Sequence, residues 1–193
     1  MMERKACFEK IRDLRDGAIV VTAYTSTFEW RRVDPSPLNF VSVGAMGQAS
    51  SHALGLAIGM PHWKILVLDG DGSLLMNLST LTTIANAAPK NLVHFVVENG
   101  SYEANGGHPI PSQGKVDFAG MARAAGYAAA FTFEGLNQFA AELPKILAME
   151  GPVFVCLKVE QGDAPPVEYD YDWLHHADRR AEFREAVKPL LRK

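Results

Sequence analysis

A turn that combines glycines with a carboxylate follows one of the apolar runs of the chain. The run 65–68 leads into Gly70, Asp71, Gly72 and Ser73. Glycines after a strand let the backbone approach a ligand closely, and the free N–H groups at the start of a following helix suit a phosphate. A carboxylate beside a phosphate is repulsive unless a cation lies between them, so the turn indicates Mg²⁺ bound by Asp71. The alternative is that Asp71 only caps the helix.

A second polar turn follows the next apolar run. Residues 92–97 lead into Glu98 and Asn99, and Asn99 lies far enough beyond Asp71 for one helix and one strand to separate them. Neighbouring strands of a parallel sheet deliver their carboxyl ends to one place, so the amide oxygen of Asn99 could join Asp71 at the same cation. Irregular backbone beyond Asn99 can turn a further carbonyl inward. The two turns predict Mg²⁺ held by few protein ligands and completed by phosphate oxygens.

Together the two turns resemble the diphosphate-binding signature of thiamine-diphosphate enzymes. The segment 70–73 followed by Asn99 carries the resemblance, and the segments 43–57 and 99–107 extend it. All of them look like the C-terminal half of the phosphonopyruvate and sulfopyruvate decarboxylases. The close resemblance covers residues 40–109, and the flanking elements match in pattern only.

The resemblance implies roles for individual residues. Asp71 and Asn99 correspond to the side-chain ligands of Mg²⁺, and Ser101 to the residue that gives a backbone carbonyl. Met46 corresponds to the bulky apolar residue that keeps the cofactor bent, with a core residue at a helix start as its alternative. The other implied cofactor-binding residues are Gly44, Ala45, Gly70, Gly72, Ser73 and Tyr102. Gly44 corresponds to the residue whose carbonyl accepts a hydrogen bond from the aminopyrimidine.

One loop departs from the pattern of these decarboxylases. They usually carry Gln-Pro-Thr after the paired glycines, whereas this chain has His108, Pro109 and Ile110. The loop lies close to where the substrate is expected, so the identity of the substrate stays open. We expect His108 to act on the substrate side, because an imidazole titrates near neutral pH and suits proton transfer.

The resemblance also implies an activity and a partner. It implies the cofactor-binding subunit of a decarboxylase for a small acidic 2-oxo acid similar to sulfopyruvate or phosphonopyruvate. In this superfamily a Glu on a separate pyrimidine-binding domain starts the proton relay, and the chain has no room for that domain before residue 40. We therefore expect it on a partner chain, in a homodimer or an assembly of two subunits of each kind. Alternatives are an acetolactate-synthase-like carboligase subunit, or a non-catalytic protein of the same fold.

Strands and helices that could position these residues alternate along the chain. The expected strands are the apolar runs 18–22, 40–43, 65–68, 92–97, 128–131 and 153–159, and the expected helices are 46–59, 74–88, 118–125, 136–149 and 177–191. Runs that are continuously apolar are typical of strands buried on both faces of a parallel sheet. We predict one α/β domain over residues 1–193. Its mostly parallel sheet is doubly wound, with about six strands and helices on both faces.

Two stretches lack periodicity, and loops of that length in a compact domain are usually functional or mobile. They are residues 100–114 and 161–173, the second of which begins a C-terminal tail over 161–193. We expect the loop 106–112 and the segment 161–176 to form a lid that becomes ordered in the full complex.

Composition excludes several classes of function. Hydrophobic residues make up 48% of the chain and its net charge is −3, which is ordinary for a globular domain and unlike a nucleic-acid-binding protein. The chain contains no apolar run of the roughly 20 residues that span a bilayer, and its start lacks the apolar core of a signal peptide. We expect a cytoplasmic protein in which Cys7 and Cys156 stay reduced and buried.

For several other polar residues the structural interpretation is the stronger one. His94 lies inside an apolar run and is expected in the core, and His52 is expected to pack in a helix. Thr22, Thr25 and Ser26 follow the first strand, where they either contact the diphosphate or substrate or are ordinary turn residues.

Overall fold

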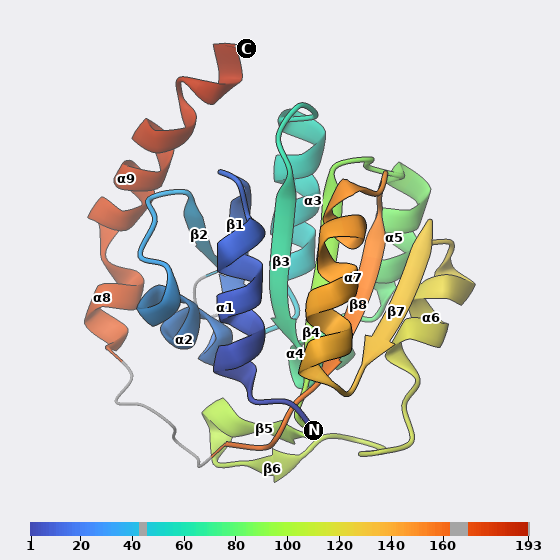
Figure 1. Ribbon diagram of the computed structural model, residues 1–193. Helices are drawn as coiled ribbons and strands as arrows, with labels where there is room; N and C mark the ends of the chain where they lie inside the picture. The colour runs from blue at the N-terminus through green and yellow to red at the C-terminus, as the bar shows by residue number, and fades with distance from the viewer. Residues whose placement is uncertain (43–45, 163–169, 193) are drawn as a thin grey trace.

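A six-stranded parallel sheet forms the centre of the molecule, in the order β2–β1–β3–β4–β8–β7 (Figure 1). The computed structural model describes residues 1–42, 46–162 and 170–192. The strands are β1 (Ile19–Ala23), β2 (Asn39–Ser42), β3 (Ile65–Gly70), β4 (Leu92–Glu98), β7 (Ala129–Phe133) and β8 (Val153–Lys158). All six predicted strands are therefore confirmed, and so is the doubly wound α/β fold.

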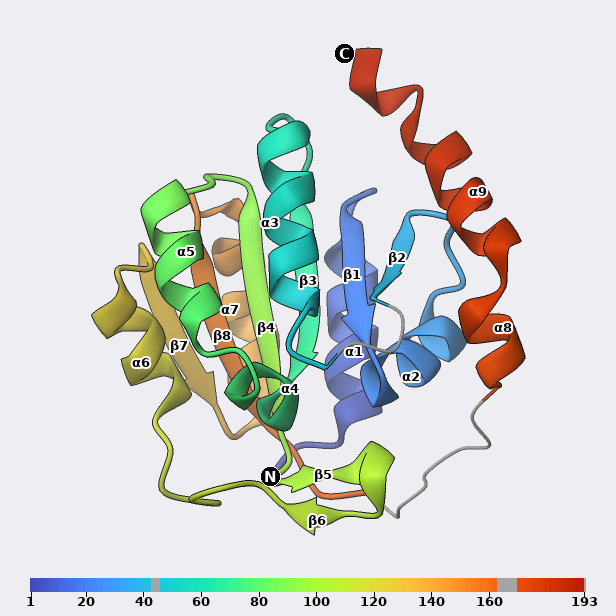
Figure 2. The same ribbon diagram turned by 180° about the vertical axis from the view of Figure 1, so that it is seen from behind.

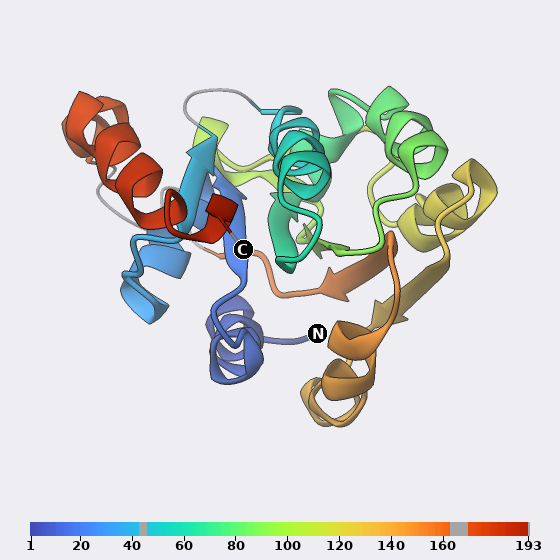
Figure 3. The same cartoon turned by 90° about the horizontal axis from the view of Figure 1, so that it is seen from above.

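Helices cover both faces of this sheet, as the view from above shows (Figure 3). One face carries α1 (Arg4–Leu14), α2 (Thr25–Val33) and α7 (Leu136–Ala148), and the other carries α3 (Ala49–Gly59), α5 (Ser79–Ala87) and α6 (Phe118–Ala125). Along β3, Ile65 and Val67 belong to one apolar layer, while Leu66 and Leu68 belong to the other. Successive residues of a strand point to opposite faces, so two covered faces explain why the strands are continuously apolar.

Several predicted helix boundaries are wrong. The helix predicted over 46–59 begins at Ala49, because Gly47 adopts a positive φ of 84° that a helix does not contain. The helix predicted over 74–88 is two helices, α4 (Asp71–Leu75) and α5, separated by a turn. Neither α1 nor α2 is anticipated by the sequence pattern.

The stretch 100–114 is more regular than predicted. It contains an antiparallel hairpin of β5 (Ser101–Tyr102) and β6 (His108–Pro109), joined by the 3₁₀ turn η1 (Glu103–Asn105). Gly106 and Gly107 close the hairpin at positive φ, which glycine adopts without steric strain. Seen from behind, the hairpin lies at the carboxyl ends of the central strands (Figure 2).

The C-terminal tail runs along the β2 edge of the sheet (Figure 1). It forms α8 (Tyr171–His175), α9 (Ala177–Val187) and the short η2 (Leu190–Arg192). Helix α8 lies in a stretch that the sequence pattern predicts as irregular. Its cap explains it, since the Asp170 carboxylate accepts a hydrogen bond from the Trp173 N–H at 2.8 Å. Residues 163–169 of the predicted lid lie outside the described residues, and the mobility of the lid stays a prediction.

The direction in which strands are added reverses at β1, which pairs with β2 on one side and β3 on the other. In open α/β sheets ligands bind outside the carboxyl ends of the strands at such a switch point. This topology brings the turns after β1 and β3 together. Within the described residues, no helix is long and apolar enough to cross a membrane.

Candidate functional site

A cleft opens at the carboxyl ends of β1, β3 and β4, where the strand order reverses. Eight of the predicted site residues line it: Met46, Gly70, Asp71, Gly72, Ser73, Asn99, Ser101 and Tyr102. Gly44 and Ala45, the other two predicted cofactor contacts, lie outside the described residues. The structure therefore brings together the turns that the sequence places nearly thirty residues apart.

Asp71 is the buried carboxylate at the centre of this cleft. Its Oδ1 accepts a hydrogen bond from the Gly72 N–H, and its Oδ2 accepts one from the Gly100 N–H, both at 2.7 Å. The second bond joins the turn after β3 to the turn after β4. Asp71 therefore does more than cap a helix, and the N-cap position of α4 belongs to Gly70.

Burial raises the pKa of the Asp71 carboxyl from 3.8 to about 6, although hydrogen bonds from Gly100 and Gly72 act in the opposite direction. A desolvated carboxylate is stabilised in its charged form by a nearby cation. The burial of Asp71 thus favours a metal ion bound beside its carboxylate.

The turn after β4 presents two further oxygen atoms. The Asn99 Oδ1 accepts a hydrogen bond from the Ser101 N–H at 2.9 Å, which fixes the amide beside the cleft. The Ser101 Oγ is buried and, among the described residues, has no hydrogen-bond partner. A buried hydroxyl without a partner is unfavourable, so this atom points to a group that binds in the cleft.

Gly72 leaves space that any side chain would fill. A Cβ atom at this position would lie 2.5 Å from the Cε1 atom of the Tyr102 ring. The aromatic ring therefore lies directly against the glycine turn, and only glycine fits between them.

The turn that carries Met46 is hydrogen-bonded to the segment that follows β3. The Gly47 N–H donates to the Ser73 Oγ and the Asn77 side-chain amide donates to the Gly47 carbonyl, both at 2.9 Å. Met46 is only partly buried and lines the cleft. This position suits the predicted contact with a cofactor better than a place in the core.

A buried network of charged residues at the cleft is absent from the sequence predictions. Arg4 lies between two carboxylates: its Nε is 2.7 Å from the Glu29 Oε2, and its Nη2 is 2.7 Å from the Glu103 Oε2. The Glu103 Oε1 also accepts a hydrogen bond from the Gly162 N–H at 2.8 Å. The network connects α1, α2, the hairpin turn and the tail, and no local sequence pattern announces contacts between residues so far apart.

The turn after β1 also reaches the cleft. Thr25 and Ser26 line it, whereas Thr22 accepts a hydrogen bond from the Thr27 hydroxyl at 3.0 Å and does not. Tyr24, which the sequence analysis does not single out, has a φ of 45°. A positive φ in a residue other than glycine is strained, and such strain is common at ligand-binding turns.

The histidines take different positions. His108 is exposed on β6, opposite Tyr102 in the hairpin, and is not among the residues that line the cleft. His94 is fully buried, with its Nδ1 3.1 Å from the Tyr127 hydroxyl. The His52 Nδ1 lies 2.9 Å from the Ser42 hydroxyl. The core position predicted for His94 is confirmed, whereas His52 is exposed on α3 and packs by the edge contact of its ring with Phe40.

Both cysteines are buried, and no disulfide joins them. Burial raises the pKa of the Cys7 thiol to about 12. Burial also raises the pKa of the Cys156 thiol, which donates a hydrogen bond to the Glu98 Oε2 at 3.0 Å. Neither thiol has the depressed pKa of a nucleophile.

The donors in the cleft fit Mg²⁺ together with a diphosphate. Within the described ranges, no cluster of three or more His, Cys, Asp or Glu residues could enclose a metal by itself. One carboxylate, one amide oxygen and a nearby backbone carbonyl are typical of Mg²⁺, which completes its octahedral shell with phosphate oxygens and water.

Comparison with known proteins also points to a diphosphate cofactor. Residues 20–157 match the family described as thiamine pyrophosphate enzyme, C-terminal TPP binding domain. A phosphonopyruvate decarboxylase from Streptomyces viridochromogenes is 39% identical over 148 residues, which are 77% of this chain and 37% of that protein. The sulfopyruvate decarboxylase subunit beta of Methanothermobacter thermautotrophicus is 34% identical over 173 residues, which are 89% of this chain and 90% of that protein.

The solved structures agree with this comparison. A candidate thiamin diphosphate-dependent enzyme from Mycobacterium smegmatis superposes with a TM-score of 0.71 and 26% identity, over 83% of this chain and 32% of that one. The chain spans less than half the length of the phosphonopyruvate decarboxylases it matches.

Proposed function

This chain belongs to the thiamine-diphosphate enzymes, whose C-terminal cofactor-binding domain it matches, and we propose that it is the cofactor-binding subunit of a decarboxylase for a small acidic 2-oxo acid. One observation carries the proposal. The bond from the Gly100 N–H to the Asp71 Oδ2 joins the two turns of the diphosphate signature at a single buried carboxylate. The similarity to a sulfopyruvate decarboxylase subunit beta over nearly the whole of both chains supports the reaction and the substrate class.

In this proposal Mg²⁺ is held by the side-chain oxygens of Asp71 and Asn99 and by the backbone carbonyl of Ser101. These are hard oxygen donors, and the burial of Asp71 strengthens its attraction for a cation. The metal neutralises a diphosphate that would otherwise be repelled by the Asp71 carboxylate.

The other cleft residues hold the organic parts of the cofactor. Gly70, Gly72 and Ser73 form a floor that the diphosphate can approach closely, with the Tyr102 ring as its wall. Met46 supports the bend between the two rings. On the basis of the family resemblance, Gly44 remains a proposed contact to the aminopyrimidine and Ala45 a proposed contact to the cofactor.

Thiamine diphosphate, if bound in this cleft, would supply a nucleophilic carbon and an electron sink for decarboxylation. The chain positions this cofactor by fixed backbone turns, and the Arg4–Glu103 pair holds the hairpin against the cleft. We propose that His108, exposed on the same hairpin, acts on the substrate side when the complex is assembled.

A partner chain is proposed to supply the carboxylate that starts the proton relay. The glutamates close to the cleft in the described part of the chain are already engaged: Glu29 and Glu103 pair with Arg4, and Glu98 accepts from Cys156. The relative named subunit beta supports an assembly of unlike chains.

The proposal is tested by measuring carbon dioxide release from sulfopyruvate, phosphonopyruvate and pyruvate, with thiamine diphosphate and Mg²⁺ present. The purified chain is assayed alone and together with the pyrimidine-domain chain of the same source. We expect no turnover by the chain alone and turnover of an acidic substrate by the pair. Turnover by the chain alone would disprove the need for a partner, and a reconstituted pair that prefers pyruvate would disprove the substrate class.

A further inference from the structure

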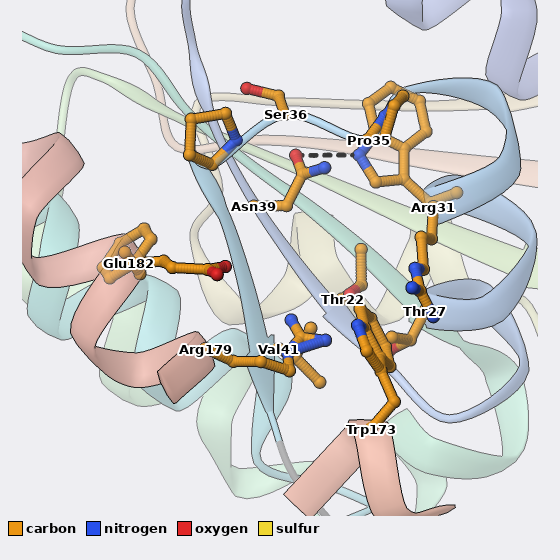
Figure 4. A pocket seen from close by; sticks show the side chains of 13 residues that line it. Thr22, Thr27, Arg31, Pro35, Ser36, Asn39, Val41, Trp173, Arg179 and Glu182 are labelled. Atoms are coloured by element: carbon orange, nitrogen blue, oxygen red, sulfur yellow. Dashed lines mark hydrogen bonds between the residues drawn. The ribbon is translucent and has the colours of Figure 1, made fainter. Parts of the chain in front are cut away.

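A second cavity, of about 350 Å³, lies between α2, β2 and the C-terminal helices α8 and α9 (Figure 4). It shares no described lining residue with the cofactor cleft. A volume near the lower end of the range of roughly 300–1,000 Å³ is suited to a small molecule. We call this space the arginine cavity, after Arg31 of α2 and Arg179 of α9, which both reach into it.

The two arginines are held by one tryptophan. The Arg31 Cζ lies 3.6 Å from the centre of the Trp173 ring, and the Arg179 Cζ lies 3.3 Å from it. Stacking on an indole orients a guanidinium while leaving its N–H groups free to bind a ligand. The two guanidinium groups therefore stack on opposite faces of the same ring, and each charge lies within range of the other.

These guanidinium groups are incompletely paired by the protein. The Arg179 Nη1 is buried and has no hydrogen-bond partner among the described residues. Burial, with the neighbouring charge of Arg31, lowers the pKa of the Arg179 guanidinium to about 10, which leaves it charged at neutral pH. Among the described residues, Arg31 has one ion-pair contact, to the exposed Asp170 at 4.0 Å.

The one carboxylate that lines the cavity among the described residues does not pair with the arginines. Glu182 lies at the exposed mouth of the cavity, and no hydrogen bond or ion pair joins it to either arginine among the described residues. A buried guanidinium N–H without an acceptor is unfavourable, so an external oxyanion would stabilise this arrangement.

Several neutral polar groups of the wall are already hydrogen-bonded to one another. Thr27 donates to Thr22, and the Asn39 Oδ1 accepts from both Trp30 and Arg15. The rest of the wall includes apolar groups such as Val41 and Phe183. Among the described residues, the charged donors of the wall are therefore those of the two arginines, and its apolar groups suit an apolar body.

We propose that the arginine cavity binds a small organic anion whose carboxylate, phosphonate or sulfonate group accepts hydrogen bonds from Arg31 and Arg179. The site is separate from the cofactor cleft, so binding there does not depend on thiamine diphosphate. It gives a ligand-binding role to the C-terminal tail, which lies beyond residues 20–157 of the family match.

The test is calorimetric titration of the full chain at low salt with propylphosphonate, and in parallel with inorganic phosphate. We expect saturable one-to-one binding of propylphosphonate, with phosphate weaker by about tenfold because it lacks an apolar body. Binding should persist in Asp71→Ala, which removes the cofactor site. Loss of propylphosphonate binding in Asp71→Ala would assign the anion to the cleft and overturn the proposal. If phosphate binds with equal affinity, the proposal that the ligand carries an organic group is overturned.

Substitutions distinguish specific binding by the two arginines from a general effect of positive charge. Arg179→Gln and Arg31→Gln should each weaken propylphosphonate binding at least about tenfold, and Arg179→Lys less, because lysine keeps the charge but loses the planar fork. The matched control is Arg184→Gln, an exposed position on α9 that lines neither cavity, and it should stay within about twofold of wild type. If Arg179→Gln fails to fold, Arg31→Gln provides the same test of binding. No saturable binding by the wild-type chain, or equal weakening by Arg184→Gln, would overturn the site.

Discussion

The cofactor cleft and the arginine cavity are built from different parts of the chain. The cleft is made by backbone turns at strand ends that hydrogen-bond to one another, as the Gly100 N–H does with Asp71 and the Ser101 N–H with Asn99. The arginine cavity is made by long side chains on helices at the edge of the sheet, where Arg31 and Arg179 meet at Trp173.

This difference predicts how each region responds to substitution. The turns of the cleft belong to the packed centre of the fold, so changes there should disturb stability and ligand binding together. The side chains of the arginine cavity stand at the edge of the sheet, so changes there should alter ligand binding while the fold stays intact. The following experiments compare the two regions.

The largest effect on stability is expected from Arg4→Met at the cleft. The substitution leaves the carboxylates of Glu29 and Glu103 without their shared cation, and breaking a buried ion pair destabilises a protein by about 3–5 kcal/mol. Urea unfolding measures the change. Arg12→Met on the same helix removes only an exposed pair with Asp13 and should change the free energy of unfolding by less than about 1 kcal/mol. Equal losses for both would contradict a structural role of the buried network.

Gly72→Ala should have the next largest effect. The added Cβ would lie 2.5 Å from the Tyr102 ring, and such overpacking destabilises by about 1–3 kcal/mol. Gly55→Ala is the control, since a Cβ there meets nothing within 4 Å on α3, and it should stabilise the chain by about 0.4–1 kcal/mol. If Gly72→Ala unfolds at the same urea concentration as wild type, the ring does not lie against this turn in solution.

A pH dependence of cofactor binding should follow from Asp71. Burial raises its pKa to about 6 in the folded chain, compared with 3.8 for the free group. Between these values the folded state holds the proton more tightly than the unfolded state, so this group's contribution to stability falls as the pH rises through that window. A proton also competes with the metal.

Affinity for thiamine diphosphate and Mg²⁺ should therefore fall with decreasing pH below about 6, by up to tenfold, or about 1.4 kcal/mol, per pH unit. Calorimetric titrations at several values on either side of this midpoint measure the fall. A constant affinity across that range would mean that the Asp71 carboxylate does not bind the cation.

The smallest effect on stability is expected at the arginine cavity. Arg179→Gln loses the stacking on Trp173, which contributes about 0.5–1 kcal/mol at a partly exposed site. It also removes a charge that the described residues leave without a hydrogen bond at Nη1, so the free energy of unfolding should change by no more than about 1 kcal/mol. The same urea titration measures it. A loss comparable to that of Arg4→Met would erase the contrast between the two regions and assign Arg179 to the structural core.

The parts of the molecule that local pattern determines could be predicted from the sequence. Continuous apolar runs predict all six strands, because both faces of the sheet are covered. The turn at Asp71 and the turn at Asn99 predict a shared site, because parallel strands bring their carboxyl ends to one edge. Both predictions depend on backbone geometry that short segments encode.

Contacts between distant side chains could not be predicted in the same way. The pairing of Arg4 with Glu103 requires α1 to pack beside the hairpin, and no spacing in the sequence specifies that packing. The hairpin itself depends on pairing between residues as close as Tyr102 and His108, yet two-residue strands are too short to show a period. The meeting of Arg31 and Arg179 at Trp173 depends on the tail returning to the β2 edge.

The most direct test of the central assignment is a calorimetric titration of thiamine diphosphate into the full chain, with Mg²⁺ present and with Mg²⁺ removed by chelation. The wild-type chain is compared with Asp71→Ala, and with Asp117→Asn as a control, since Asp117 caps α6 away from the cleft and asparagine caps equally well. We predict Mg²⁺-dependent binding by wild type and by Asp117→Asn, and none by Asp71→Ala. Unchanged binding in Asp71→Ala, or binding of equal strength without Mg²⁺, would contradict the assignment of this cleft as the cofactor and metal site.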